Sequence, residues 1–185
     1  MGMAAPLYHT AEMVRALVDE TRHWPRYETV HGELLVTPAP RLWHQEVVGR
    51  LYAALRGYAT RQPVGHVFAS PSDISWGPDT LVQPDLFVVP VEQARTLTWS
   101  KVTTLLLAIE VLSPSSVRAD RFTKRHLYQE VAVPLYWVID ADDRSAEVWT
   151  RVDLLPRAEK DVLVWMPNGA TDPFEIGLEE LFRAI

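Results

Sequence analysis

Two carboxylates stand beside apolar, strand-like runs, where an unpaired charge would be costly. Glu110 lies within the apolar stretch 103–112, and Asp85 follows Pro84 directly before the apolar run 86–89. A carboxylate buried in such a place must be paired, metal-bound or neutral. Two carboxylates at the mouths of adjacent strands can hold one Mg²⁺, which completes its coordination with waters and phosphate oxygens. The pattern therefore predicts a metal site for phosphate chemistry.

Each carboxylate also has a purely structural explanation. Glu110 could face a buried arginine or point outward at the end of its strand. Asp85 could be a turn residue that caps a strand after Pro84. Neither alternative needs a metal ion.

Lysine is scarce, with three among the 18 lysine and arginine residues. Lys124 falls in the predicted helix 117–131, directly after the strand that carries Glu110, and Tyr128 lies one turn later on the same helix face. An ammonium group can orient an attacking water and can change its pKa in a buried site, which a guanidinium cannot. The alternatives are a solvated lysine on a basic helix face, and an arginine bias that reflects only genomic base composition.

Composition excludes several classes of protein. The chain of 185 residues is 48% hydrophobic and 23% charged, which excludes intrinsic disorder. It contains no cysteine, so disulfides, thiolate metal sites and cysteine nucleophiles are excluded together. The apolar runs are too short to span a bilayer, and the first residues do not have the pattern of a signal peptide. We therefore expect a cytoplasmic protein with no membrane partner.

The net charge of −6 is unevenly distributed along the chain. Residues 1–139 hold 13 acidic and 13 basic residues, whereas residues 140–185 hold 11 acidic and 5 basic residues and supply the whole excess. Within 118–125, four basic residues accompany one acidic residue, a local +3. This distribution argues against nonspecific coating of DNA and is compatible with a local anion site.

Hydrophobic periodicity and turn residues predict a mixed central sheet flanked by helices, in the α/β (α+β) class. We expect a single domain, with an N-terminal helix and hairpin extension (1–40), a core (41–151) and an acidic C-terminal strand and helix (152–185). The predicted helices are 10–21 with Thr10 as N-cap, 41–61, 117–131 and 177–184. The predicted strands are 26–37 (a hairpin turning at His31 and Gly32), 64–69, 81–89, 103–112, 134–140, 145–151 and 161–165, with turns between 70 and 80.

Several pieces of sequence occur in a characteristic order along roughly residues 10–150. They are YETVHGEL at 27–34, His44 at the head of a helix, QPDL at 83–86, IEVLSPSS at 109–116 with Asp120, Lys124 and Tyr128 after it, and VPLYWVID at 133–140. With this ordered set the chain resembles the Uma2 family of restriction-endonuclease-like proteins, within the PD-(D/E)xK nuclease superfamily.

The resemblance implies a restriction-endonuclease-like fold with Asp85 and Glu110 as the acidic, metal-binding pair. It also implies magnesium as the cofactor, with manganese as a possible substitute. The superfamily pattern has a lysine two residues after the glutamate, where this chain has Leu112. Lys124 on the following helix is the natural replacement, because it could reach the same metal-bound water.

Two further candidates for the catalytic set occupy positions typical of the family. Glu33 could add a third carboxylate near the metal, or be an exposed hairpin charge. His44 could bond a phosphate or shuttle a proton, or simply satisfy a local backbone group.

Four other residues are expected to support the site. Asp73, Asp120 and Tyr128 are expected around the catalytic residues, with Asp120 capping the helix of Lys124. Arg121 and Arg125 are expected to bind the substrate backbone, although Arg121 could instead pair with Asp140.

The leading hypothesis is a magnesium-dependent endonuclease that hydrolyses DNA through a metal-activated water. A first alternative is a catalytically inactive nucleic-acid-binding or regulatory module, favoured by the missing strand lysine and the acidic C-terminal part. A second is a self-associating protein whose aromatic residues Tyr136, Trp137 and Trp149 form a dimer interface, although such aromatics more often belong to the core of the hairpin and sheet. A homodimer is expected for the nuclease as well, since two active sites are needed to cut both strands together.

Overall fold

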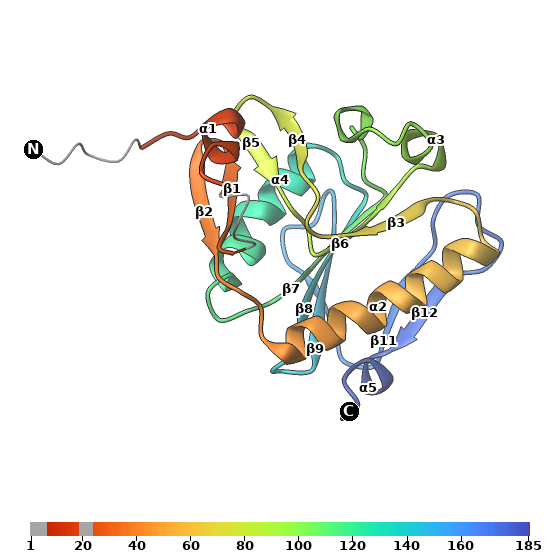
Figure 1. Ribbon diagram of the computed structural model, residues 1–185. Helices are drawn as coiled ribbons and strands as arrows, with labels where there is room; N and C mark the ends of the chain where they lie inside the picture. The colour runs from red at the N-terminus through yellow and green to blue at the C-terminus, as the bar shows by residue number, and fades with distance from the viewer. Residues whose placement is uncertain (1–6, 19–23) are drawn as a thin grey trace, which may run out of the picture.

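The computed structural model describes residues 7–18 and 24–185, and its centre is a six-stranded sheet (Figure 1). The strands of this sheet are β3 (His66–Ala69), β6 (Leu86–Val89), β7 (Leu107–Val111), β8 (Leu135–Asp140), β9 (Ser145–Thr150) and β10 (Arg157–Glu159). They lie in the order β10-β9-β8-β7-β6-β3. The pair β7 and β8 is parallel and the other pairs are antiparallel, so the sheet is mixed as expected.

Smaller elements surround the central sheet. A four-stranded sheet has the order β2-β1-β5-β4, and β11 pairs with β12 in a two-stranded one. These strands are β1 (Arg26–Val30), β2 (Glu33–Thr37), β4 (Ile74–Gly77), β5 (Thr80–Val82), β11 (Val162–Trp165) and β12 (Phe174–Gly177). The helices are α1 (Ala11–Arg15), α2 (Leu42–Arg61), α3 (Val91–Ala94), α4 (Arg125–Glu130), α5 (Leu178–Leu181), the 3-10 helix η1 (Trp99–Lys101) and the π-helix η2 (Ala119–Lys124).

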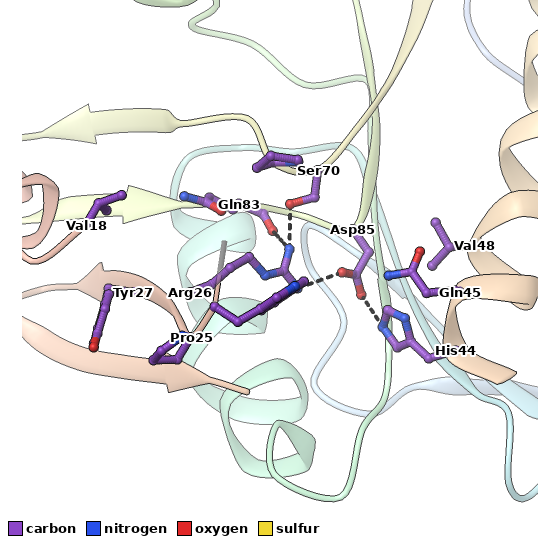
Figure 2. A pocket seen from close by; sticks show the side chains of 12 residues that line it. Val18, Pro25, Arg26, Tyr27, His44, Gln45, Val48, Ser70, Gln83 and Asp85 are labelled. Atoms are coloured by element: carbon purple, nitrogen blue, oxygen red, sulfur yellow. Dashed lines mark hydrogen bonds and ion pairs between the residues drawn. The ribbon is translucent and has the colours of Figure 1, made fainter. Parts of the chain in front are cut away.

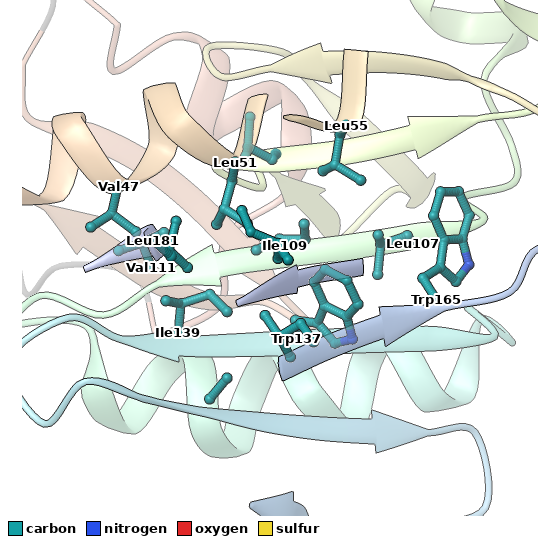
Figure 3. Close-up of a cluster of buried hydrophobic side chains, with 14 of the residues drawn as sticks. Val47, Leu51, Leu55, Leu107, Ile109, Val111, Trp137, Ile139, Trp165 and Leu181 are labelled. Atoms are coloured by element: carbon teal, nitrogen blue, oxygen red, sulfur yellow. The ribbon is translucent and has the colours of Figure 1, made fainter. Parts of the chain in front are cut away.

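One face of the central sheet is covered by α2, which packs there together with β11, β12 and α5 (Figure 1). Side chains alternate across a strand, so Leu107, Ile109 and Val111 of β7 all point to this face. They meet Leu51 and Leu55 of α2 in a buried apolar cluster (Figure 3). This face of the sheet is therefore a structural core.

The opposite face of the sheet carries the polar site. Ala108 of β7 and Phe87 of β6 point to this face and pack with residues of α4. By the same alternation Glu110 lies on this face, and so does Asp85, two residues before Phe87. The alternation of β6 and β7 thus brings both predicted carboxylates to the side covered by η2 and α4.

The predicted fold class is confirmed, as are the hairpin at 26–37, the long helix and the hairpin of β8 and β9. Thr10 is the N-cap of α1, where its side chain accepts a hydrogen bond from the Met13 N–H at 3.1 Å. In the part of the chain that the structure describes, no helix is both long and apolar enough to cross a membrane.

Several predicted boundaries were wrong. Helix α1 ends at Arg15 rather than continuing toward residue 21, and residues 19–21 lie outside the described residues. The predicted strand 81–89 is divided at Pro84, which has no N–H for a ladder. The predicted strand 103–112 begins only at Leu107, since the N–H groups of Thr103 and Thr104 donate to the Gln93 side chain instead.

Other elements were missed by the sequence analysis. The segment expected to form turns between residues 70 and 80 contains β4, which pairs with β5 through an irregular register. The remaining missed elements are short, and short elements carry little periodicity. They are α3, η1, β10 and β12.

Candidate active site

Asp85 and Glu110 lie next to each other across neighbouring strands. Leu86 of β6 pairs with Ile109 of the antiparallel β7, so Asp85, one residue earlier, comes opposite Glu110. The Asp85 N–H donates to Glu110 Oε2 at 3.3 Å, and the Val111 N–H donates to Asp85 Oδ2 at 3.0 Å. Both side chains are buried, with 5% and 2% of their surface exposed. The predicted acidic pair is therefore brought together.

Lys124 reaches this pair from the end of η2. Its Nζ lies 3.0 Å from Glu110 Oε1, and the residue is 3% exposed. Tyr128, one turn later, donates its hydroxyl to the same Glu110 oxygen at 3.2 Å. Leu112, where the superfamily pattern has lysine, packs instead among the apolar residues of this face. The helix thus places a lysine ammonium next to Glu110 although the strand does not.

Glu28 is a third buried carboxylate that the sequence analysis did not select. Its Oε1 lies 3.0 Å from Lys124 Nζ and accepts the Gln83 N–H at 2.7 Å, while its Oε2 has no hydrogen-bond partner among the residues that the structure describes. Asp120 is a fourth, 3.4 Å from Lys124 Nζ. Glu28, Asp85, Glu110 and Asp120 are called the carboxylate cluster below. One lysine therefore serves three of its four members.

Asp85 has two further partners, Arg26 and His44 (Figure 2). Arg26 of β1 donates from Nη2 to Asp85 Oδ1 at 3.0 Å, and His44 Nε2 lies 3.1 Å from Asp85 Oδ2. His44 is in the first turn of α2 and is 7% exposed. Arg26, like Glu28, was missed by the sequence analysis. The available signal was the alternation of β1, which puts Arg26, Glu28 and the buried Val30 on one face.

The environment shifts the pKa values of the acidic pair in opposite directions. Burial raises the pKa of Glu110 well above its usual value, because the positive charge of Lys124 does not offset burial and the nearby charges of Asp120, Asp85 and Glu28. Burial acts on Asp85 in the same sense. There the hydrogen bond from His44 and the charge of Arg26 outweigh it and lower the pKa of Asp85. Asp85 is thus an anion, and Glu110 binds a proton readily.

Sequence and structure comparisons identify the family. A model of the Uma2 family, described as "Putative restriction endonuclease", matches residues 11–167, which is most of the chain. The chain belongs to the Uma2 family. A crystal structure described as a "putative nuclease belonging to DUF820 from Anabaena variabilis ATCC 29413" is similar with a TM-score of 0.74. The two chains are 20% identical over 94% of this chain and 97% of that one, which shows a shared fold. No curated protein sequence matches.

The carboxylate cluster of this Uma2 protein has the donor chemistry for a divalent cation. Its four carboxylates are accompanied by two nearly buried cations, Arg26 and Lys124, which leaves a charge of −2 if all are ionised. A cavity of about 10 Å³, the size of one water molecule, is lined by Asp85 and Glu110 among others. No group of three or more potential ligands forms a preformed cage within residues 7–18 and 24–185. Two carboxylates completed by waters remain the arrangement that Mg²⁺ uses.

The structure does not bring Glu33 into this cluster. Glu33 is exposed beside the hairpin turn, where it pairs with Val30 in the β1–β2 register. Glu28 supplies the carboxylate of the hairpin instead. Asp73 is connected to the cluster only indirectly, since its Oδ1 accepts from Gln83 Nε2 at 2.9 Å.

The basic residues of η2 and α4 also differ from expectation. Asp120 does not cap its helix but is buried within η2, close to Lys124. Arg121 pairs with Asp140 at 3.1 Å, which confirms the alternative expected from sequence, and also with Glu147 at 2.7 Å. Arg125 lies over the Trp149 ring, 4.6 Å from its centroid. Both arginines are therefore engaged within the chain rather than directed at the carboxylate cluster.

The aromatic residues that the second alternative assigned to a dimer interface are in the core, as the other interpretation of these residues predicted. Trp137 is fully buried under α2, and Tyr136 and Trp149 are 2% and 6% exposed on the other face. Tyr136 also donates its hydroxyl to the Asp120 carbonyl at 2.9 Å, which supports η2. The proposed aromatic surface for self-association was wrong, because burial of these large rings holds the fold together.

The shifted pKa of Glu110 predicts how stability depends on pH. The folded state binds the proton of Glu110 more tightly than the unfolded state does, so its stabilising effect is complete at low pH and is lost as pH rises through the raised pKa. We expect the free energy of unfolding of the wild type to fall relative to Glu110→Gln between about pH 5 and pH 8. Urea denaturation across this range measures the difference. The exposed Glu92→Gln is the matched control, and a difference between wild type and Glu110→Gln that does not vary with pH would contradict the assignment.

Proposed function

We propose that this Uma2 protein is a metal-dependent endonuclease that hydrolyses phosphodiester bonds of DNA. The observation that carries the proposal is the contact of 3.0 Å between Lys124 Nζ and Glu110, beside Asp85. This contact supports the presence of all three groups of the nuclease pattern, which are two carboxylates and a lysine. The lysine comes from a helix here and not from the strand that carries the glutamate. The membership in a family described as restriction endonucleases supports the same reaction class.

In this proposal Asp85 and Glu110 hold Mg²⁺, for which Mn²⁺ can substitute. The bound ion supplies a water of lowered pKa and neutralises charge that develops on the phosphate. Lys124 orients the attacking water and holds its own proton, since the surrounding carboxylates, although opposed by burial, raise the pKa of Lys124 well above its usual value. Glu28 and Tyr128 act as positioning residues, through Lys124 and Glu110 respectively.

Arg26 and His44 complete the proposed site on the other side of Asp85. Their contacts of 3.0 and 3.1 Å hold the Asp85 carboxylate in one orientation. Both side chains also line a larger pocket that opens next to the carboxylate cluster. They are therefore placed to bind a substrate phosphate. This role replaces the one that the sequence analysis proposed for Arg121 and Arg125.

The test is cleavage of supercoiled plasmid DNA with Mg²⁺, with Mn²⁺ and with EDTA. We expect nicked and linear products only with a divalent ion, and we expect Asp85→Asn to abolish them, because that change removes one of the two charged ligands. Glu92→Gln, on the exposed surface of α3, is the control and should cleave normally. Cleavage that survives in EDTA or in Asp85→Asn would refute the proposed metal pair.

One observation favours the binding module as a second candidate. Both Asp85 oxygens already have partners in Arg26, His44 and the Val111 N–H, so the cluster is stable without a metal ion. This candidate predicts DNA binding with no cleavage by any divalent ion. The homodimer stays a prediction for either candidate, and the mass in solution tests it.

A further inference from the structure

A second, larger pocket opens beside the carboxylate cluster. Its volume is about 480 Å³, within the range of about 300–1,000 Å³ typical of small-molecule sites. Its walls come from β1, from the first turns of α2 and from the loops before β4 and β6 (Figure 2). We call it the side pocket. The proposed hydrolysis uses the residues on one of its walls and leaves the rest unassigned.

The side pocket is continuous with the proposed active site. Arg26, His44 and Asp85 line both the side pocket and the small cavity next to Glu110 and Lys124. In Figure 2 these three side chains meet in the middle of the view, joined by their hydrogen bonds. A phosphodiester held at Asp85 and Glu110 therefore has an adjoining nucleoside close to the side pocket.

The walls of the side pocket fit a flat heteroaromatic ring. Trp24 contributes an aromatic group, and Val48 contributes an apolar patch from α2. The Arg26 guanidinium lies over the Trp24 ring, 5.0 Å from its centroid, so a positive charge accompanies the aromatic surface. Gln45 is exposed on α2 and provides an amide that can both donate and accept hydrogen bonds. Aromatic surface, amide and cation together are the means by which proteins hold unstacked bases.

We propose that the side pocket binds an unpaired nucleobase of the strand being cut, on a nucleotide next to the scissile phosphate. The proposal rests on the proposed nuclease function and adds the class of substrate. A base inside a duplex is stacked and paired, so it cannot enter a pocket in the protein without being extruded, which costs a few kcal/mol. The substrate is accordingly single-stranded DNA, or DNA with an unpaired nucleotide at the cut.

The test compares binding of a labelled single-stranded oligonucleotide with binding of the same oligonucleotide in a blunt duplex. Fluorescence anisotropy in EDTA at fixed salt measures both without cleavage. We expect the single strand to bind more tightly, and Trp24→Ala to weaken its binding by about 5- to 150-fold, the loss associated with one base–aromatic contact. Duplex affinity should not change. Trp99→Ala removes a tryptophan that is 42% exposed and outside the side pocket, and should change neither affinity.

A second variant keeps the test decisive if Trp24→Ala fails to fold. Gln45→Trp changes an exposed residue of α2 and fills the side pocket, so it should weaken binding of the single strand alone. Equal affinity for the two forms of DNA, or equal weakening of both by these variants, would overturn the proposal. The failure of the two proposals is distinguishable. Plasmid cleavage without the strand preference removes the side-pocket assignment only. A strand preference that depends on Trp24, with no cleavage of either plasmid or single-stranded DNA by any divalent ion, removes the nuclease function only.

Discussion

Replacing Lys124 with methionine should reduce DNA cleavage by about 10²- to 10⁴-fold, the range for loss of a positioned acid–base group. The ammonium is 3.0 Å from Glu110 and is 3% exposed, so no water can take its place without rearrangement. Lys124→Arg should remain impaired, because a planar guanidinium is larger than the compact ammonium and cannot take its place in the buried cluster. Initial rates of plasmid nicking at saturating Mg²⁺ measure the loss.

The control for this prediction must separate chemistry from folding. Lys101→Met removes an exposed lysine of η1 and should cleave at the wild-type rate. The double variant Lys124→Met with Glu28→Gln removes one negative charge together with the positive one. It should regain stability without regaining cleavage. If the double variant cleaves like the wild type, Lys124 acts only through folding.

The second large effect is on stability. Lys124→Met leaves Glu28, Glu110 and Asp120 buried without their common cation, and breaking a buried ion pair in this way costs about 3–5 kcal/mol. We expect urea denaturation to show a loss of this size in the free energy of unfolding. Such a loss is a large part of the stability of a typical domain.

The pH dependence of the loss of stability in Lys124→Met provides a second test of this prediction. The pKa values of Glu110 and Asp120 are already raised by burial, so low pH protonates them and relieves the repulsion that the variant leaves. The destabilisation by Lys124→Met should therefore be smaller near pH 5 than near pH 8. The exposed Lys101→Met should stay within about 0.5 kcal/mol of the wild type. A loss from Lys124→Met as small as that of the control would mean that the buried network does not stabilise the fold.

The principal residues of the candidate site could be predicted from sequence because burial makes their positions unusual. Glu110 interrupts an apolar strand and Asp85 precedes one, and period-two alternation then places both on one face. Lys124, one of few lysines, lies at a position on the helix from which its side chain reaches Glu110. These inferences depend on the local pattern of apolar and charged residues along the sequence.

The choice between Glu28 and Glu33 required the tertiary structure. Both are carboxylates of the same hairpin, but Glu28 shares a strand face with Val30 and is 1% exposed, whereas Glu33 lies beside the turn in solvent. Which face of the hairpin is covered depends on η2 and α4, which bring Lys124 to Glu28 and bury Val30 in a cluster with Leu127. That contact joins segments far apart in the chain.

The partners of the arginines also depended on long-range packing. Arg26 was not selected from sequence, yet it bonds Asp85 across 59 positions of sequence. Arg121 was expected to bind substrate or to pair with Asp140; it does bond Asp140, and it also bonds Glu147 of β9, which sequence did not suggest. A charged side chain that is buried needs a partner, and a charged residue within an apolar stretch of sequence indicates that need. Periodicity in the sequence determines which side chains share a face of one helix or strand. The partner of a buried charge depends on which helices and strands pack together. Only the tertiary structure of this Uma2 protein establishes that packing.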